Sequence, residues 1–69
     1  MIEIRFERPI EGLRYAMDLL VCLCGCQPIG RVMLDARGNV EACRVPEADA
    51  REVEVRFAAF RPVRVQDGK

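Results

Sequence analysis

Three of the four cysteines in this 69-residue chain lie close together, at Cys22, Cys24 and Cys26, and the fourth is Cys43. Thiolates are the ligands of tetrahedral zinc and of iron–sulfur clusters, and soft thiolate sites also hold Cu(I). Common zinc sites use paired C-x-x-C motifs, whereas this chain has C-x-C-x-C. The four cysteines are therefore candidate ligands for zinc, copper or an iron–sulfur cluster.

The conformation of residues 20–26 decides whether these thiols can share one ion. On a strand, Cys22, Cys24 and Cys26 lie on one face, because side chains alternate with a period of two. On a helix, Cys22 and Cys24 point about 200° apart and cannot bind the same ion without unwinding. We favour the interpretation that the cysteines are small core residues, since free cysteine is often buried. Metal binding and then a redox or disulfide role are the alternatives.

The residue types that are missing exclude several functions. The chain contains no His, Ser, Thr or Trp, so serine and threonine nucleophiles, His general bases and imidazole metal ligands are absent. Eleven acidic and eleven basic residues give a net charge of zero. This balance argues against nucleic-acid binding through a basic field and against a polybasic membrane surface. We therefore expect no enzymatic activity, no nucleic-acid partner and no membrane partner.

Length and composition predict one domain over residues 1–69, near the lower size limit for a self-sufficient core. With 51% hydrophobic residues, so short a chain has difficulty covering its apolar surface, which favours a homodimer or another protein partner. The first residues alternate instead of forming a secretory signal, and the apolar stretch from Leu19 is too short to span a bilayer. These features predict a cytoplasmic protein whose cysteines stay reduced unless they bind metal.

Residues 10–24 fit two conformations. A helix places one apolar stripe on one side, with Pro9 in its first turn and Gly25 just past its end. A strand is also compatible, because every second residue from Leu13 to Leu23 is apolar or aromatic. Leu, Arg, Ala and Met favour the helix by propensity, so the helix is our prediction.

Residues 29–45 predict a β-hairpin. Ala36, Arg37 and Gly38 form a three-residue loop in which Gly38 takes the left-handed conformation. The loop pairs Asp35 with Asn39, so that Leu34 faces Val40 and Val32 faces Ala42 on an apolar side, with Arg31, Met33, Glu41 and Cys43 on the other. A slip of one residue exchanges the faces and buries Cys43. The register therefore decides whether Cys43 is available for chemistry.

Two similar segments, IEIRF at residues 2–6 and VEVRF at 53–57, both alternate as half-buried strands do. Antiparallel pairing about Ile4 and Val55 sets Glu3 against Arg56 and Arg5 against Glu54, whereas parallel pairing opposes like charges. Residues 2–6 also complement themselves, because two copies paired about Ile4 oppose Glu3 and Arg5. We therefore predict an interaction edge, and a self-pairing dimer as one use of it. Its residues are Ile2, Glu3, Ile4, Arg5 and Phe6.

The remaining elements are short. Arg8-Pro9 is expected to end the first strand, because Pro cannot donate to a ladder. Pro46 opens a helical turn over residues 46–50, and a helix through residues 50–60 is the less favoured alternative to the strand at 53–57. Residues 61–65 predict a short edge strand, and residues 66–69 a polar tail.

Two family resemblances concern the second half of the chain. GRVMLDARGNVEACRV followed by FRPVRVQDGK resembles the hairpin and terminal strand of TonB-type C-terminal domains, through Gly30, Asp35, Gly38, Val40, Arg61 and Pro62. The intervening segment is several residues shorter than in that family, so the resemblance implies these elements without a function. The hairpin, the PEADA turn and the final strand also resemble SH3-like barrels, which implies an all-β fold and, by fold alone, no function.

Together these patterns predict an α+β domain, a small antiparallel β-sheet with one helix packed on it. The alternative is a small all-β SH3-like barrel in which residues 13–24 form a strand. The function we expect is that of a small non-enzymatic protein-interaction, regulatory or accessory protein, and the alternative is a thiolate metal-binding protein using the four cysteines. The expected core consists of Ile2, Ile4, Phe6, Leu13, Met17, Leu20, Val32, Leu34, Val40, Val53, Val55 and Phe57.

Overall fold

The computed structural model describes residues 1–65, which form four strands and two α-helices, each helix continued by a short turn of another helical type. In chain order the elements are β1 (Ile2–Ile10), α1 (Leu13–Asp18), the π-helical turn η1 (Leu19–Leu23), β2 (Met33–Leu34), β3 (Val40–Val45), α2 (Glu47–Arg56), the 3₁₀ turn η2 (Ala58–Phe60) and β4 (Pro62–Val65). The polar tail expected at residues 66–69 lies outside the described residues.

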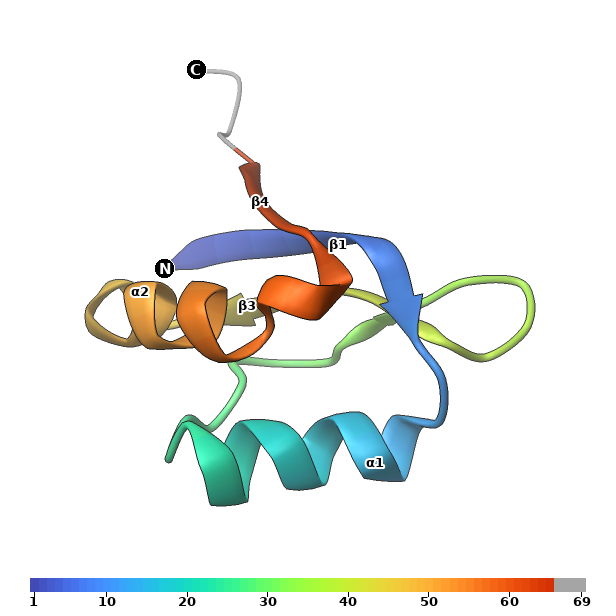
Figure 1. Cartoon of the computed structure of the whole chain (residues 1–69), viewed down its shortest axis with the longest axis horizontal. Helices are drawn as coiled ribbons and strands as arrows, with labels where there is room; N and C mark the ends of the chain where they lie inside the picture. The colour runs from blue at the N-terminus through green and yellow to red at the C-terminus, as the bar shows by residue number, and fades with distance from the viewer. Residues whose placement is uncertain (66–69) are drawn as a thin grey trace.

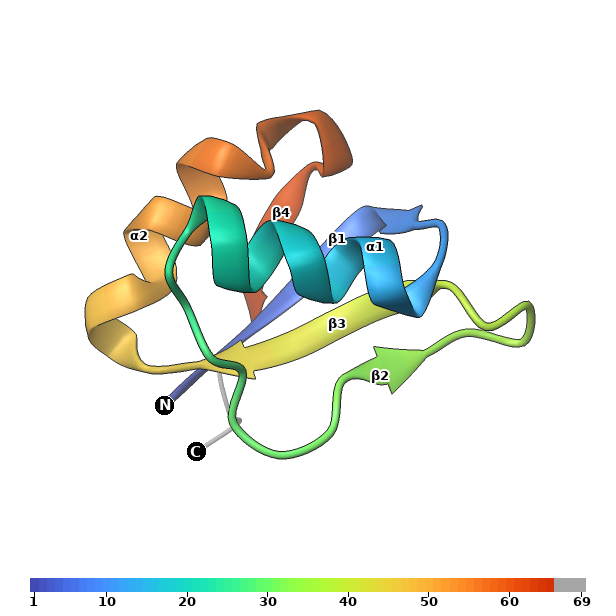
Figure 2. The same cartoon turned by 90° about the horizontal axis from the view of Figure 1, so that it is seen from below.

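The strands form one antiparallel sheet in the order β2-β3-β1-β4. β3 lies between β1 and β2, and β1 lies between β3 and β4, so the chain consists of two interleaved β-α-β units. This split β-α-β connectivity is the arrangement called ferredoxin-like. Figure 1 shows α1 on one side of the sheet, and Figure 2, seen from that side, shows both helices in front of the strands.

The expected α+β class with an antiparallel sheet is therefore confirmed, and the sheet does not close into the barrel of the alternative prediction. Two helices pack on the sheet where one was expected. Because the helices cover one face, each strand needs apolar residues on only that face, which suits a chain of this length.

The first strand is longer than expected. Ile4 and Phe6 point into the core, and the pairing with β3 then skips from Arg5 to Ile10, which opposes Val40. Pro9 was expected to end the strand, but it lies in this irregular stretch, where its missing N–H breaks no ladder bond. Ile10 lies on the core face again four residues after Phe6, whereas Arg8 between them is exposed.

Residues 13–23 are helical, which confirms the helix over the alternative strand. The helix begins after Gly12, whose φ of 89° suits glycine, rather than at Pro9. Ala16 and Leu20 are fully buried, whereas Leu13, expected in the core stripe, is 43% exposed. The stripe is displaced because the helix starts three residues later than the sequence pattern suggested.

The hairpin loop is as predicted. The Asp35 N–H donates to the Asn39 carbonyl over 2.8 Å, the Gly38 N–H donates to the Asp35 carbonyl, and Gly38 has φ 83°. The Asp35 carboxylate also accepts hydrogen bonds from the backbone N–H groups of Arg37 and Asn39, each at 2.9 Å. Asp35 therefore fixes the loop from both its backbone and its side chain.

Beyond the loop the expected register is wrong. Leu34 opposes Val40 as predicted, but Met33, not Val32, opposes Ala42, so Glu41 is an extra residue without an opposite neighbour. This bulge places Val40 and Ala42 on opposite faces of the sheet, and Cys43 enters the core with Val45.

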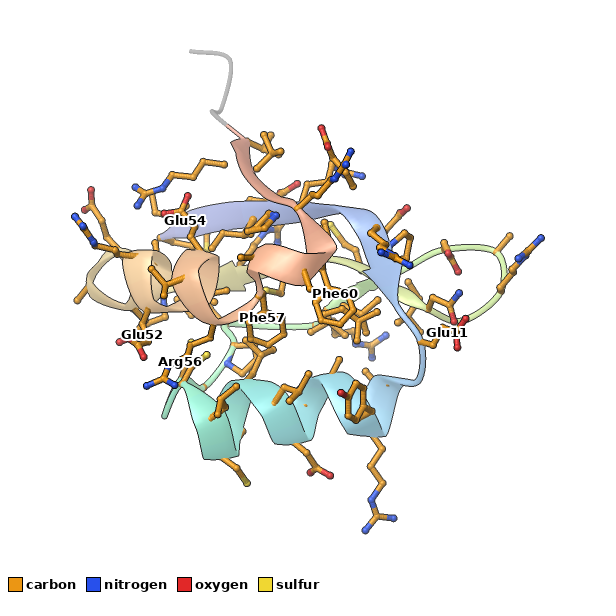
Figure 3. All side chains as sticks on the ribbon, in the orientation of Figure 1. Glu11, Glu52, Glu54, Arg56, Phe57 and Phe60 are labelled. Carbon is orange, nitrogen blue, oxygen red and sulfur yellow. The ribbon has the colours of Figure 1, made fainter. Side chains whose placement is uncertain are left out.

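The strand predicted at residues 53–57 is wrong, because α2 continues to Arg56. Val53 and Phe57 face the core one helical turn apart, whereas Val55 is 63% exposed. The Phe57 ring lies 5.5 Å from that of Phe6 and 6.0 Å from that of Phe60, measured between centroids. Figure 3 shows Phe57 projecting from the end of α2 toward the side of the molecule where α1 lies.

One core joins the sheet to both helices. Leu13, Leu34 and Val55 were expected in it but are exposed, and Ile2, Met17 and Val32 are only partly buried at its margin. The fully or almost fully buried residues of this core are Ile4, Phe6, Ile10, Ala16, Leu20, Cys26, Val40, Cys43, Val45, Ala50, Val53 and Phe57. Half of these, including both core cysteines, were not in the expected set.

Candidate functional site

The predicted cysteine site is built by the end of the first helix. In η1 the helix widens, so that the Cys24 N–H donates to the Leu19 carbonyl at 3.3 Å and the Cys26 N–H to the Leu20 carbonyl at 2.9 Å. Gly25, with φ 63°, then reverses the chain and turns Cys26 back under the helix. The Ile29 N–H donates to the Arg44 carbonyl at 2.8 Å, which holds this loop against β3 beside Cys43.

The four thiols have different environments. Cys22 is exposed, Cys24 is partly buried, and Cys26 and Cys43 are buried at 1% and 0% exposure. Burial, with a smaller contribution from the neighbouring Cys26, raises the pKa of Cys43 to about 12. Burial also raises the pKa of Cys26 to about 11, with a further contribution from the carboxylate of Asp49.

These environments keep the core thiols protonated at neutral pH. Burial likewise raises the pKa of Cys24, and the carboxylate of Glu52 adds to the effect. Nucleophilic attack requires the thiolate, so these three side chains are poorly prepared for that role.

Among residues 1–65, no group of three or more Cys, Asp or Glu side chains is arranged to hold a metal ion. Cys22 is exposed to solvent, whereas Cys26 and Cys43 lie in the core. Metal binding by the four cysteines remains a prediction from the sequence, which native mass spectrometry of protein purified without chelators tests.

The predicted interaction edge lies in a central strand. Ile2, Glu3, Ile4 and Arg5 pair with β3, and Glu3 to Phe6 pair with β4 on the other side. The segment from Ile2 to Phe6 therefore presents no free backbone edge in this fold, and a second copy has no room to pair about Ile4. The outer strands of the sheet are β2 and β4.

An apolar groove runs between α1 and β2. It has a volume of about 390 Å³. Leu13 and Met17 supply its helix wall and Val32 and Leu34 its strand wall, and Pro28 also lines it. Leu13 and Leu34 are 43% and 44% exposed. The groove is thus an apolar strip that remains open to solvent beside the edge of the sheet.

Two other hollows have charged residues in their linings. One of about 670 Å³ lies at the end of the sheet and is lined by Glu3, Arg44, Glu47 and Arg64 among others. Glu3 there lies 3.6 Å from Arg44, so charges within the hollow compensate one another. The other, of about 520 Å³, lies between the end of β1 and η2, and charged Arg8 and Glu11 line it together with Pro9, Tyr15, Ala59 and Phe60. Both hollows therefore have mixed charged and apolar linings.

The groove was not predicted from the sequence, because Leu13 and Leu34 were expected in the core. The apolar residues of α1 and of β2 were expected to lie in one core. A strand of two residues is too short to cover the helix stripe, and the excess apolar surface predicted from composition is found here. The shortness of the apolar run Val32–Leu34 was the feature of the sequence that could have indicated an uncovered helix.

Comparisons with protein-family models, with curated proteins and with solved structures gave no match to this chain. The helices in residues 1–65 are also too short and too polar for any of them to cross a lipid bilayer. Since fold by itself assigns no function, the function has to be inferred from the geometry of the groove.

Proposed function

We propose that this chain is a small, non-enzymatic interaction protein that binds an apolar protein segment in the groove between α1 and β2. The observation that carries the proposal is the exposure of Leu13 and Leu34 on the two walls of one groove. Single exposed apolar residues are ordinary, but a connected apolar strip with a polar rim marks an interaction site. Gln27 and Arg31 supply that rim.

The thiols support a binding role over a catalytic one. The core thiols Cys26 and Cys43 are shielded from solvent, and the chain contains no Ser or Thr nucleophile and no imidazole base to activate the exposed Cys22. A regulatory or accessory subunit needs only a surface. We also propose a reducing compartment such as the cytoplasm, in which the four cysteines would stay as thiols.

Site-specific photo-cross-linking tests the proposal. A benzophenone amino acid replaces Leu34 in the full chain, which is expressed in the cells that produce the protein, and adducts are identified by mass spectrometry. We expect one dominant protein adduct. The matched control places the same group at Ala48, which is exposed on α2. Equal, unspecific labelling from both positions contradicts the proposal.

A further inference from the structure

We propose that the occupant of the groove is a second copy of this chain, which pairs its β2 edge antiparallel to the first about a two-fold axis at Met33. This inference rests on the proposed function and names its partner. β2 is a terminal strand of the sheet, and Figure 2 shows it at the rim, beside α1. Among residues 1–65, no strand pairs with its outer side.

The backbone of β2 is oriented for such pairing. The Asp35 N–H points inward, to the carbonyl of Asn39. Because hydrogen-bonding groups alternate along an antiparallel strand, the backbone groups of Leu34 and Val32 point outward. Centring the two copies on Met33 sets Val32 opposite Leu34 of the second copy, so the outward groups of both strands meet in hydrogen-bonded pairs.

The charges of the edge are complementary in the same register. Residues 31–35 read Arg-Val-Met-Leu-Asp, so pairing about Met33 sets Arg31 of each copy against Asp35 of the other. Arg31 is exposed and has no ion pair among the described residues. The two loop hydrogen bonds to Asp35 both end on Oδ1, which leaves Oδ2 for the incoming guanidinium.

The apolar side chains fit this register as well. Leu34 opposes the core residue Val40 and therefore lies on the helix face, and Val32 shares that face by alternation. Pairing about Met33 brings Val32 of one copy against Leu34 of the other, directly beside the groove wall formed by Leu13. The two grooves then join across the axis, and the exposed strip of each is covered.

A parallel pairing or a slipped register loses these features. A parallel arrangement in the same register opposes Arg31 to Arg31 and Asp35 to Asp35, which is destabilising. A slip of one residue turns the apolar face of one copy toward the polar face of the other. The sequence therefore supports one register, and that register is closed by two-fold symmetry.

The size of the full-length protein, measured by light scattering over a range of concentrations, tests the pairing. We expect a monomer–dimer equilibrium, and we expect Arg31→Asp to raise the dissociation constant about tenfold or more, because repulsion acts at two symmetry-related contacts. Arg37→Asp makes the same charge change in the exposed loop and is expected to leave the dimer intact. Asp35→Asn added to Arg31→Asp keeps a loop-capping oxygen and is expected to restore part of the affinity.

Disulfide trapping reports the register independently. In a Cys22→Ala background, Met33→Cys sets two thiols directly opposite each other, at a distance that a disulfide can span. Arg31→Cys does not, since residue 31 opposes residue 35. Rapid cross-linking of the Met33→Cys variant, without comparable cross-linking of the Arg31→Cys variant, supports the pairing.

Three outcomes overturn the pairing. They are a monomer at every concentration, equal effects of Arg31→Asp and Arg37→Asp on the dissociation constant, and equal cross-linking of Met33→Cys and Arg31→Cys. A photo-adduct from Leu34 to a different protein then leaves the proposed function standing, whereas unspecific labelling removes both.

Discussion

At the scale of single residues, Cys26 and Cys43 determine how the protein responds to alkaline pH. Burial raises their pKa values to about 11 and about 12, whereas a cysteine in the unfolded chain titrates near 8.5. A raised folded pKa contributes stability that is complete below the unfolded value and is lost as the pH rises through the folded value. The window for this loss therefore begins near pH 8.5 and ends above pH 11.

We predict that the free energy of unfolding falls by about 1.4 kcal/mol per pH unit for each of these thiols within that window. Urea unfolding in the presence of a reductant, between about pH 8 and pH 10, measures the slope. Cys43→Ala is expected to remove one thiol's share of it. Cys22→Ala is the matched control, because that side chain is exposed, and it is expected to leave the slope unchanged. Equal slopes in all three proteins contradict the assignment.

The sequence predicted the loop at residues 35–39 but not the burial of Cys43. Turn chemistry is local: Asp35 caps the loop and Gly38 supplies the positive φ. The bulge at Glu41, by contrast, depends on how β3 fits between β2 and β1. Whether Cys43 faced solvent or the core was thus decided by its neighbours in space.

At the scale of elements, α2 shows how an alternating pattern misleads. Val53, Val55 and Phe57 follow a period of two, but Ala50, Val53 and Phe57 also follow a helical period, and the helix forms its backbone hydrogen bonds within itself and needs no partner strand. The acidic residues Glu47 and Asp49 in the first turn and Arg56 in the last also favour the helix through its dipole. These charges indicated a helix, but the alternation of Val53, Val55 and Phe57 led to the strand prediction.

Two matched substitutions on α2 separate the helix from the strand. Val53→Ala removes buried methyl groups and is expected to lower the free energy of unfolding by about 2 kcal/mol. Val55→Ala, at a position 63% exposed, is expected to change it by less than about 0.5 kcal/mol. Chemical denaturation of the two variants gives both values. Similar losses are the result expected of a strand, in which both valines face one side.

At the scale of the whole molecule, the Glu54–Arg64 pair joins the last helix to the last strand. The Arg64 guanidinium donates two hydrogen bonds to the Glu54 carboxylate, at 2.8 and 2.9 Å, which lowers the pKa of Glu54 below its usual value. The resulting stability is present above the unfolded glutamate pKa of about 4.3. It is lost as the pH falls through the lower folded value.

We predict that Glu54→Gln lowers the thermal midpoint slightly at neutral pH, because both side chains still contact solvent. The difference from the wild type is expected to vanish at acid pH, and amide exchange in β4 is expected to accelerate at neutral pH. Glu52→Gln is the control, since it removes a pair with Arg56 inside α2 and leaves β4 attached. A constant difference at every pH contradicts the role given to the pair.

The sheet order was the part of the fold that was least predictable from the sequence. The similarity of residues 2–6 to 53–57 suggested that these segments pair, but the second segment is helical and β1 pairs with β3 and β4. Strand pairing between distant segments depends on the crossovers that carry the chain over the sheet. Hairpin pairing depends on a turn, so only the adjacent pair β2–β3 was predicted.

The bulge in β3 also bears on how the chain can change in length. Because Glu41 is the extra residue, a deletion there leaves Val40, Cys43 and Val45 on the core face in simple alternation. A deletion at Arg5 would instead turn either Ile4 or Phe6 out of the core. Evolutionary relatives that are one residue shorter than this protein are therefore expected to have their gap at residues 41–42, between two stretches that keep their length.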